Sequence, residues 1–167
     1  MLSAAISSGQ GQSNLPTIGS SAADFKLFSP TLNAAIQLSA LRGQPVVLNF
    51  WGSWCEPCRD EMPALNEIAG ELKAKFTLLA IGVNEPAAKS LKYLQDNNFS
   101  NLTLLSDPET GAGADLETSA QVTKKYGVNS YPTTIFIDKA GVIQAVRLSG
   151  LTKNSFLAYL RNIDVTR

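Results

Sequence analysis

Short apolar runs alternate along the chain with segments in which apolar residues recur every third or fourth position. Residues 46–50 are almost continuously apolar, which is typical of a strand that is covered on both faces. After Cys55, the residues Met62, Leu65 and Ile68 follow one another at helical spacing and predict an amphipathic helix with one buried stripe. The same reasoning predicts strands at residues 24–28, 35–38, 46–50, 76–83, 102–105, 133–137 and 142–148, and further helices at residues 86–97, 120–126 and 152–160.

The order of these elements predicts the fold class. Strands and helices alternate through most of the chain, and a β-hairpin and a helix end it. This order favours an α/β protein with a central mixed β-sheet that is flanked by helices. The two strands expected within residues 24–38 flank a Ser-Pro turn region and predict an additional β-hairpin at the N-terminal side of this core.

A length of 167 residues fits one domain with a substantial core. Residues 1–21 are rich in Ser, Gly, Gln and Ala and are expected to form a flexible linker, so the predicted domain spans residues 22–167. No run approaches the roughly 20 consecutive apolar residues of a membrane span, and the start of the chain lacks the basic and apolar regions of a signal peptide. We expect the chain as given to be soluble.

Charge and composition exclude several classes of function. Lys plus Arg and Asp plus Glu number 14 each, so no net field attracts nucleic acid or an anionic membrane. Arg59 is expected to pair with Asp60 or Glu61 only as a solvated surface charge. The chain has no histidine, which removes the usual general base, the partner of a Cys-His or Ser-His pair and the commonest metal ligand.

The two cysteines, Cys55 and Cys58, lie where the strand at residues 46–50 passes through a short turn into a helix. Residues at this spacing share one helical face, so their sulfurs can bond without moving the backbone. Cys55 is expected to attack, because unpaired backbone N–H groups and the helix dipole favour its thiolate. Cys58, one turn inside, is expected to resolve the mixed disulfide. Pro57 fits the first helical turn, and the charge of Glu56 argues against a very strong oxidant.

Four other uses of this pair are alternatives. A purely structural disulfide would stabilise the folded protein by only on the order of 2 kcal/mol, because the loop that it closes is short. A zinc site needs four ligands, and the chain has no further Cys and no His to complete it. A redox-gated binding module would use the disulfide only to switch its affinity for a peptide. A thiol peroxidase is expected to carry a supporting threonine two or three residues before Cys55, where this chain has Ser53 and Gly52. We prefer thiol–disulfide exchange to all four.

Residues 50–59, which read Phe-Trp-Gly-Ser-Trp-Cys-Glu-Pro-Cys-Arg, and the following Glu-Met-Pro at residues 61–63 resemble the extracytoplasmic thioredoxin-like proteins of the TlpA and ResA type. The resemblance extends more weakly over residues 24–160. It implies a thioredoxin fold, to which this chain adds the N-terminal β-hairpin and a central insertion at residues 106–119 that is longer than the usual connection.

The resemblance also implies a cellular role. Proteins of this type are bacterial, membrane-tethered thiol–disulfide oxidoreductases that face the periplasm. The resemblance implies that this chain reduces protein disulfides, with apocytochrome c as a substrate during cytochrome c maturation. A membrane thiol reductant is then the electron donor. We expect a monomer that uses neither a cofactor nor a metal.

Three further positions gain a role from the resemblance. Tyr131-Pro132 matches the family's cis-proline beside the cysteines, where proline offers no donor to the sheet and the backbone of Tyr131 can pair with an extended substrate segment. Glu85 matches a carboxylate that assists proton transfer at the buried sulfur, which makes it a candidate catalytic residue beside the two cysteines. Its context also fits a cap of the helix at residues 86–97, with Glu85 in the first turn.

Two tryptophans flank the cysteine pair. Trp51 and Trp54 are expected to form an apolar rim that excludes water and receives apolar groups of the substrate, although Trp51 also fits the core. The residues expected to contact the substrate are Trp51, Trp54, Glu56, Pro57, Tyr131 and Pro132.

Overall fold

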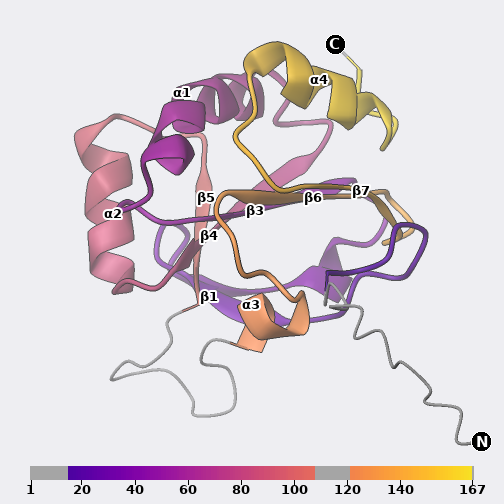
Figure 1. Ribbon diagram of the computed structural model, residues 1–167, viewed down its shortest axis with the longest axis horizontal. Helices are drawn as coiled ribbons and strands as arrows, with labels where there is room; N and C mark the ends of the chain where they lie inside the picture. The colour runs from indigo at the N-terminus through magenta and orange to yellow at the C-terminus, as the bar shows by residue number, and fades with distance from the viewer. Residues whose placement is uncertain (1–14, 108–120, 167) are drawn as a thin grey trace, which may run out of the picture.

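A five-stranded mixed sheet forms the centre of the protein (Figure 1). The computed structural model describes residues 15–107 and 121–166. The strands are β3 (Val46–Trp51), β4 (Thr77–Val83), β5 (Thr103–Asp107), β6 (Thr133–Ile137) and β7 (Ile143–Arg147), in the spatial order β5-β4-β3-β6-β7. β4 is parallel to both β3 and β5, whereas β6 is antiparallel to both β3 and β7. The predicted mixed sheet is confirmed.

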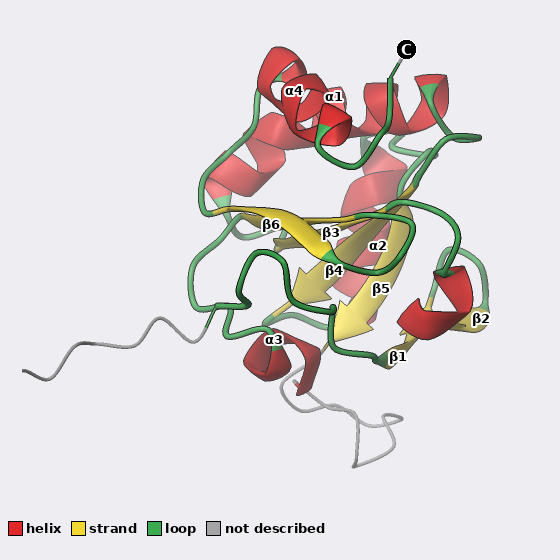
Figure 2. Ribbon diagram, turned by 90° about the vertical axis from the view of Figure 1, so that its right-hand side faces the viewer, coloured by secondary structure: helices red, strands yellow, loops and turns green. Residues whose placement is uncertain are grey.

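Helices cover both faces of the sheet. They are α1 (Glu56–Glu71), α2 (Ala87–Asp96), α3 (Gln121–Lys125) and α4 (Lys153–Arg161), and a short 3₁₀ helix, η1, spans Leu38–Leu41. Figure 2 shows α1 and α4 on one face of the sheet and α3 on the other. Each of the four predicted helices forms close to its expected bounds. Within the described ranges, none of them is long and apolar enough to span a bilayer.

The central strand β3 separates two hydrophobic clusters. All of its residues are buried. Val47 and Trp51 pack in the cluster that includes residues of α1, α2 and α4, whereas Leu48 and Phe50 pack in the cluster that includes residues of α3 and the N-terminal segment. Successive side chains of a strand point to opposite faces, so a continuous apolar run fills both clusters. The end of β3, which leads to the cysteines, is therefore anchored inside the protein.

An N-terminal hairpin lies beside β5, at one edge of the sheet. β1 (Lys26–Ser29) and β2 (Ala34–Gln37) pair antiparallel. The hairpin turn reaches the sheet at Thr31, whose Oγ1 accepts a hydrogen bond from the backbone N–H of Leu104 at 3.1 Å. The predicted hairpin is confirmed, and its turn satisfies a backbone donor of a strand that would otherwise be open to pairing with another chain.

Two predicted boundaries lie close to segments that the structure describes. Residues 1–14 of the expected linker lie outside the described residues, but Gly19 and Ser20 make backbone hydrogen bonds with Ile143 of β7 at 2.7 and 2.9 Å. These bonds attach the chain to the sheet two residues before the predicted start of the domain. The insertion expected at residues 106–119 begins inside β5, which continues to Asp107, and its remaining residues lie outside the described part of the chain.

Candidate active site

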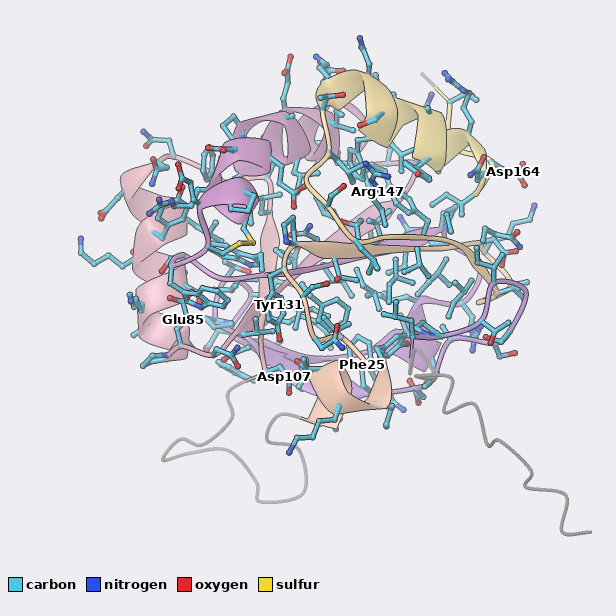
Figure 3. The ribbon with its side chains drawn as sticks, in the orientation of Figure 1. Phe25, Glu85, Asp107, Tyr131, Arg147 and Asp164 are labelled. Atoms are coloured by element: carbon cyan, nitrogen blue, oxygen red, sulfur yellow. A yellow bond between two sulfur atoms is a disulfide. The ribbon has the colours of Figure 1, made fainter. Side chains whose placement is uncertain are left out.

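The two cysteines form a disulfide at the start of α1, drawn in yellow in Figure 3. The loop after β3 brings Cys55 to the N-cap position, and Cys58 follows in the first turn, with the two Cα atoms 5.2 Å apart. Pro57 occupies the first turn as predicted, where a missing N–H costs little. The backbone N–H of Cys58 donates to Cys55 Sγ at 3.3 Å. Such a donor favours a thiolate at Cys55 when the pair is reduced.

The two sulfur-bearing residues differ in their access to solvent. Cys55 is 6% exposed, whereas Cys58 is fully buried. A substrate therefore meets Cys55 first, and this difference agrees with attack by Cys55 and resolution by Cys58. Glu56 and Pro57, which lie between the cysteines, are both exposed, and their expected contact with a substrate stays a prediction.

Glu61 is a buried carboxyl that the sequence analysis does not single out as catalytic. It lies one turn after Cys58 on α1 and is 2% exposed. Its Oε1 accepts a hydrogen bond from the Asn49 side chain at 2.7 Å, and its Oε2 accepts one from the backbone N–H of Leu151 at 2.8 Å. Burial raises the pKa of Glu61 to about 7, although both hydrogen bonds favour the charged form. A carboxyl that titrates near neutral pH can accept and return a proton during catalysis.

A buried polar network holds Glu61 in place. Asn49 on β3 is fully buried, and its Nδ2 donates both to Glu61 and to Thr134 Oγ1 on β6, the latter at 3.1 Å. Asn49 Oδ1 has no hydrogen-bond partner among the described residues. The sequence does contain a signal for this network. Asn49 interrupts an apolar strand, and Glu61 falls between Cys58 and Leu65 at the spacing of the buried helical stripe.

The charges around the helix start differ from the expected arrangement. Arg59 Nη1 donates to the backbone oxygen of Ser53 at 3.5 Å, so this exposed side chain reaches back over the loop that precedes the cysteines. The prediction that Glu61 is a solvated partner of Arg59 is wrong. The Glu61 side chain is buried and accepts hydrogen bonds from β3 and from the segment before α4.

Glu85 does not cap α2. The helix begins after Pro86, which provides no side-chain cap. The buried Glu85 carboxylate instead accepts hydrogen bonds from the backbone N–H of Ser53 at 2.8 Å, from the Ser53 hydroxyl and from the Ser90 hydroxyl at 2.7 Å. The capping alternative is therefore wrong. The carboxylate secures the loop two residues before Cys55 to the beginning of α2, and its expected catalytic role stays a prediction.

The aromatic residues near the disulfide take two different positions. Trp51 is fully buried and packs against Tyr93 with ring centroids 5.7 Å apart, in agreement with the core alternative, so an exposed rim does not include it. Trp54 is 44% exposed and meets Tyr131 edge to face at 5.5 Å. The Tyr131–Pro132 peptide bond is cis, as the resemblance implies. Because β6 begins directly after Pro132 and pairs with β3, these two residues lie beside the end of β3 that leads to the cysteines.

Comparisons with known proteins agree with this geometry. Residues 18–146 match the model of the AhpC/TSA family. The chain is 35% identical over 147 residues to the thiol-disulfide oxidoreductase ResA of Geobacillus thermodenitrificans (strain NG80-2). This alignment covers 87% of the chain and 78% of that protein.

Solved structures share the fold. The pneumococcal exposed lipoprotein thioredoxin Etrx1 from Streptococcus pneumoniae strain TIGR4 is 30% identical, with a TM-score of 0.69 over 83% of this chain and 98% of that chain. A thiol:disulfide interchange protein of the thioredoxin family from Chlorobium tepidum TLS is 21% identical and gives a TM-score of 0.72. The latter match covers 89% of this chain and 98% of that chain.

Proposed function

Because the chain belongs to the AhpC/TSA family and is a thiol–disulfide oxidoreductase with a thioredoxin fold, we propose that it reduces disulfides of protein substrates outside the cytoplasm. The observation that carries this proposal is the unequal burial of two bonded cysteines at one helix start. The outer sulfur can exchange with a partner, and the inner one can only exchange with its neighbour. The disulfide seen in the structure is the state in which such a reduction ends.

The reaction consists of two exchanges between sulfur atoms. The Cys55 thiolate attacks one sulfur of a substrate disulfide, so a bond between Cys55 and the substrate forms, the substrate disulfide breaks and the released sulfur takes a proton. The Cys58 thiolate then attacks Cys55 Sγ, which forms the internal disulfide and releases the second substrate thiol. Two electrons have passed to the substrate. A second dithiol must reduce the pair before the next turnover.

Glu61 is placed to handle the proton of Cys58. Both residues lie on the buried side of α1, three positions apart, and Cys58 has to lose its proton before the second exchange. The two groups that donate hydrogen bonds to the Glu61 carboxyl, the Asn49 side chain and the backbone N–H of Leu151, are both uncharged. We propose that Glu61 accepts this proton during resolution and returns it when the pair is reduced again.

The proposed cellular role follows the resemblance in the sequence. We place the protein at the outer side of a bacterial membrane, tethered to it, with apocytochrome c as a protein substrate and a membrane thiol reductant as electron donor. Two relatives support parts of this role: the name thiol-disulfide oxidoreductase ResA supports the reaction, and the description of another relative as an exposed lipoprotein thioredoxin supports the tether and the location outside the cytoplasm. The acidic Glu56 in the first turn of α1 partly offsets the helix dipole and favours a reductant over a strong oxidant.

Turnover with a protein disulfide tests the proposal. The protein is expected to catalyse the reduction of insulin disulfides by dithiothreitol, measured as the onset of turbidity. The reduction potential of the pair is expected at about −270 mV, the value of thioredoxin, or below it. A potential of about −120 mV would indicate an oxidant and would contradict the proposed direction. Binding of insulin chains without turnover would favour the redox-gated binding module, and consumption of peroxide would favour the peroxidase.

Glu85→Ala is expected to lower the free energy of unfolding by about 2 kcal/mol, because the buried N–H of Ser53 loses its charged acceptor. We propose that Glu85 acts by holding the loop before Cys55. Turnover should then fall while the pH of half-maximal rate stays unchanged. Should that pH move instead, the acid–base role implied by the resemblance is supported.

Lys89→Ala provides the matched control for Glu85. The Lys89 ammonium lies 4.0 Å from Glu85 Oε2, but the lysine side chain is 62% exposed. Removing so exposed a charge should change the free energy of unfolding by less than about 0.5 kcal/mol and leave turnover unchanged. A loss as large as that of Glu85→Ala would show that the ion pair, rather than the hydrogen bonds to Ser53, holds the loop.

A further inference from the structure

The indole of Trp54 lies directly against Gly52. A Cβ atom added to Gly52 would overlap the indole Nε1 and would lie 2.5 Å from Cε2 and 2.8 Å from Cδ1. Gly52 is not among the glycines with positive φ, so its backbone conformation is open to any residue. The requirement for glycine at this position is therefore the space that the indole occupies.

Two further contacts hold the same indole. Its Nε1 donates a hydrogen bond to the backbone oxygen of Val83 at 3.1 Å, at the end of β4. Its ring meets the ring of Tyr131 at an angle of 85° and a centroid distance of 5.5 Å, an edge-to-face geometry that aromatic pairs prefer. The indole thus has the loop at Gly52 on one side, β4 at its polar end and Tyr131 beside it. Contacts of this kind keep a ring in one orientation although 44% of Trp54 is exposed.

The fixed ring belongs to the residue directly before the reactive cysteine. Trp54 immediately precedes Cys55, and Tyr131 precedes the cis-proline beside the end of β3. A peptide segment that brings its own cysteine to Cys55 comes close to the exposed Trp54, the neighbouring residue in the chain. A rigid aromatic surface binds apolar side chains at a low cost in conformational entropy, whereas a ring that samples several rotamers has to be ordered first.

We infer that Gly52 is a positioning residue for the exchange reaction: by leaving space for the Trp54 indole, it fixes an aromatic surface that binds an apolar side chain next to the cysteine of a peptide substrate. This inference rests on the proposed reduction of protein disulfides. It names the substrate feature that the site prefers, and it assigns the preference to a residue without a side chain. Small disulfides, which carry no such neighbour, do not use the surface.

Gly52→Ala tests the inference, because the added methyl group displaces the indole without demanding a new backbone conformation. Quenching of tryptophan fluorescence by iodide in the reduced protein reports Trp54, since Trp51 is fully buried. The variant should be quenched more strongly than the parent. The KM for a disulfide-linked peptide with leucine beside each cysteine should rise about fivefold, the effect of losing a binding contact of moderate size. The kcat for this peptide and the rate with 5,5′-dithiobis(2-nitrobenzoate) should stay unchanged.

Specificity supplies a second measurement. The parent should prefer the leucine peptide to one with asparagine beside each cysteine by about fivefold in kcat/KM, and Gly52→Ala should lose this preference. In a Trp54→Ala background, the same substitution at Gly52 should change neither KM, because the methyl group then has no indole to displace.

Gly70→Ala is the matched control. It adds the same methyl group near the other end of α1, where its Cβ would lie 2.6 Å from Asn101 Nδ2, and it should leave quenching and KM unchanged. The inference is overturned if Gly52→Ala is quenched like the parent, if its KM is unchanged despite stronger quenching, or if its effect persists without Trp54. If the parent protein reacts with the small disulfide but with no peptide, the proposed function is contradicted instead. The quenching measurement then still reports whether Gly52 determines the position of the Trp54 indole.

Discussion

Replacing Cys58 by serine is expected to leave the protein covalently attached to its substrate through Cys55. The first exchange needs only the Cys55 thiolate and the backbone N–H of residue 58, and the serine variant keeps both. The second exchange needs the Cys58 sulfur, which the variant lacks. Serine is similar in size and fits the fully buried site. Turnover with insulin should fall by roughly three orders of magnitude, as when a member of a catalytic unit is removed, while a mixed disulfide accumulates.

Mass spectrometry under non-reducing conditions, after the reduced variant has been freed of dithiothreitol and mixed with insulin, measures this adduct as the sum of the masses of the protein and one insulin molecule, because opening one disulfide leaves the two insulin chains joined by another. The matched control is Cys55→Ser, which keeps only the sulfur of Cys58, a residue that is fully buried. That variant should form no adduct and show no turnover. Equal adduct formation by both variants would mean that Cys58 is reachable from outside, and the assignment of the two roles would then fail.

The sheet and its helices were predictable because each depends on a pattern that burial imposes directly. The apolar run at residues 46–50 is a strand between two hydrophobic clusters, and the structure shows every residue of β3 buried. Gly127, which follows the short helix α3, has a φ of 60°, which glycine adopts without strain. Such patterns predict structure correctly because each depends on residues that are close in the sequence, and the packing of the core does not change the local structure that they favour.

The cis peptide bond before Pro132 shows what local patterns leave out. An X-Pro bond is cis in only about 5–6% of cases, so the residues alone favour trans. The prediction of a cis bond came from the resemblance in residues 50–59 and 131–132, and the structure confirms it. A backbone isomer that tertiary packing selects is not encoded in the spacing of apolar residues.

Glu85 shows how a local reading can fail at a functional position. Asn-Glu-Pro before a helix fits a cap, yet the carboxylate bonds to Ser53, a residue 32 positions away, and to Ser90. The partner at Ser53 lies in a loop that is brought to α2 only because β3 and β4 are neighbours in the sheet. Pairings across the sheet are set by the fold, and the sequence around Glu85 carries no sign of them.

Glu61 is the functional residue that the sequence analysis underestimates. Its neighbours Arg59 and Asp60 are exposed, and a carboxylate beside them is usually a surface charge. The buried stripe of α1 passes through it nevertheless, and the polar residue Asn49 in the opposite strand supplies its partner. A polar side chain in each of two elements that are otherwise buried is the pattern that would have indicated the pair.

Glu61→Gln is expected to remove a pH-dependent loss of stability from the oxidised protein. The pKa of Glu61 is raised from 4.5 to about 7 in the folded protein, so the folded state holds the proton more tightly than the unfolded chain. No penalty exists below pH 4.5, where both states are protonated. The penalty grows as the pH rises to 7 and then stays constant at about 3 kcal/mol, at 1.36 kcal/mol for each pH unit. Glutamine cannot ionise. The Asn49 Oδ1, which has no hydrogen-bond partner among the described residues of the parent, can accept a hydrogen bond from the glutamine amide once the Asn49 side-chain amide flips.

Urea titrations at pH 5, 6, 7 and 8 measure the free energy of unfolding of the variant and of the parent. The value for the variant minus the value for the parent should increase with pH, by about 3 kcal/mol in total. The same substitution should slow insulin reduction at pH 7 by about two orders of magnitude, because Cys58 loses its proton acceptor. Asp60→Asn is the matched control: it changes an exposed carboxylate one residue away and should leave both measurements unchanged. A parent and a Glu61→Gln variant with the same pH dependence of stability would show that Glu61 stays charged in the folded protein, and a proton transfer from Cys58 to this carboxyl would then lose its basis.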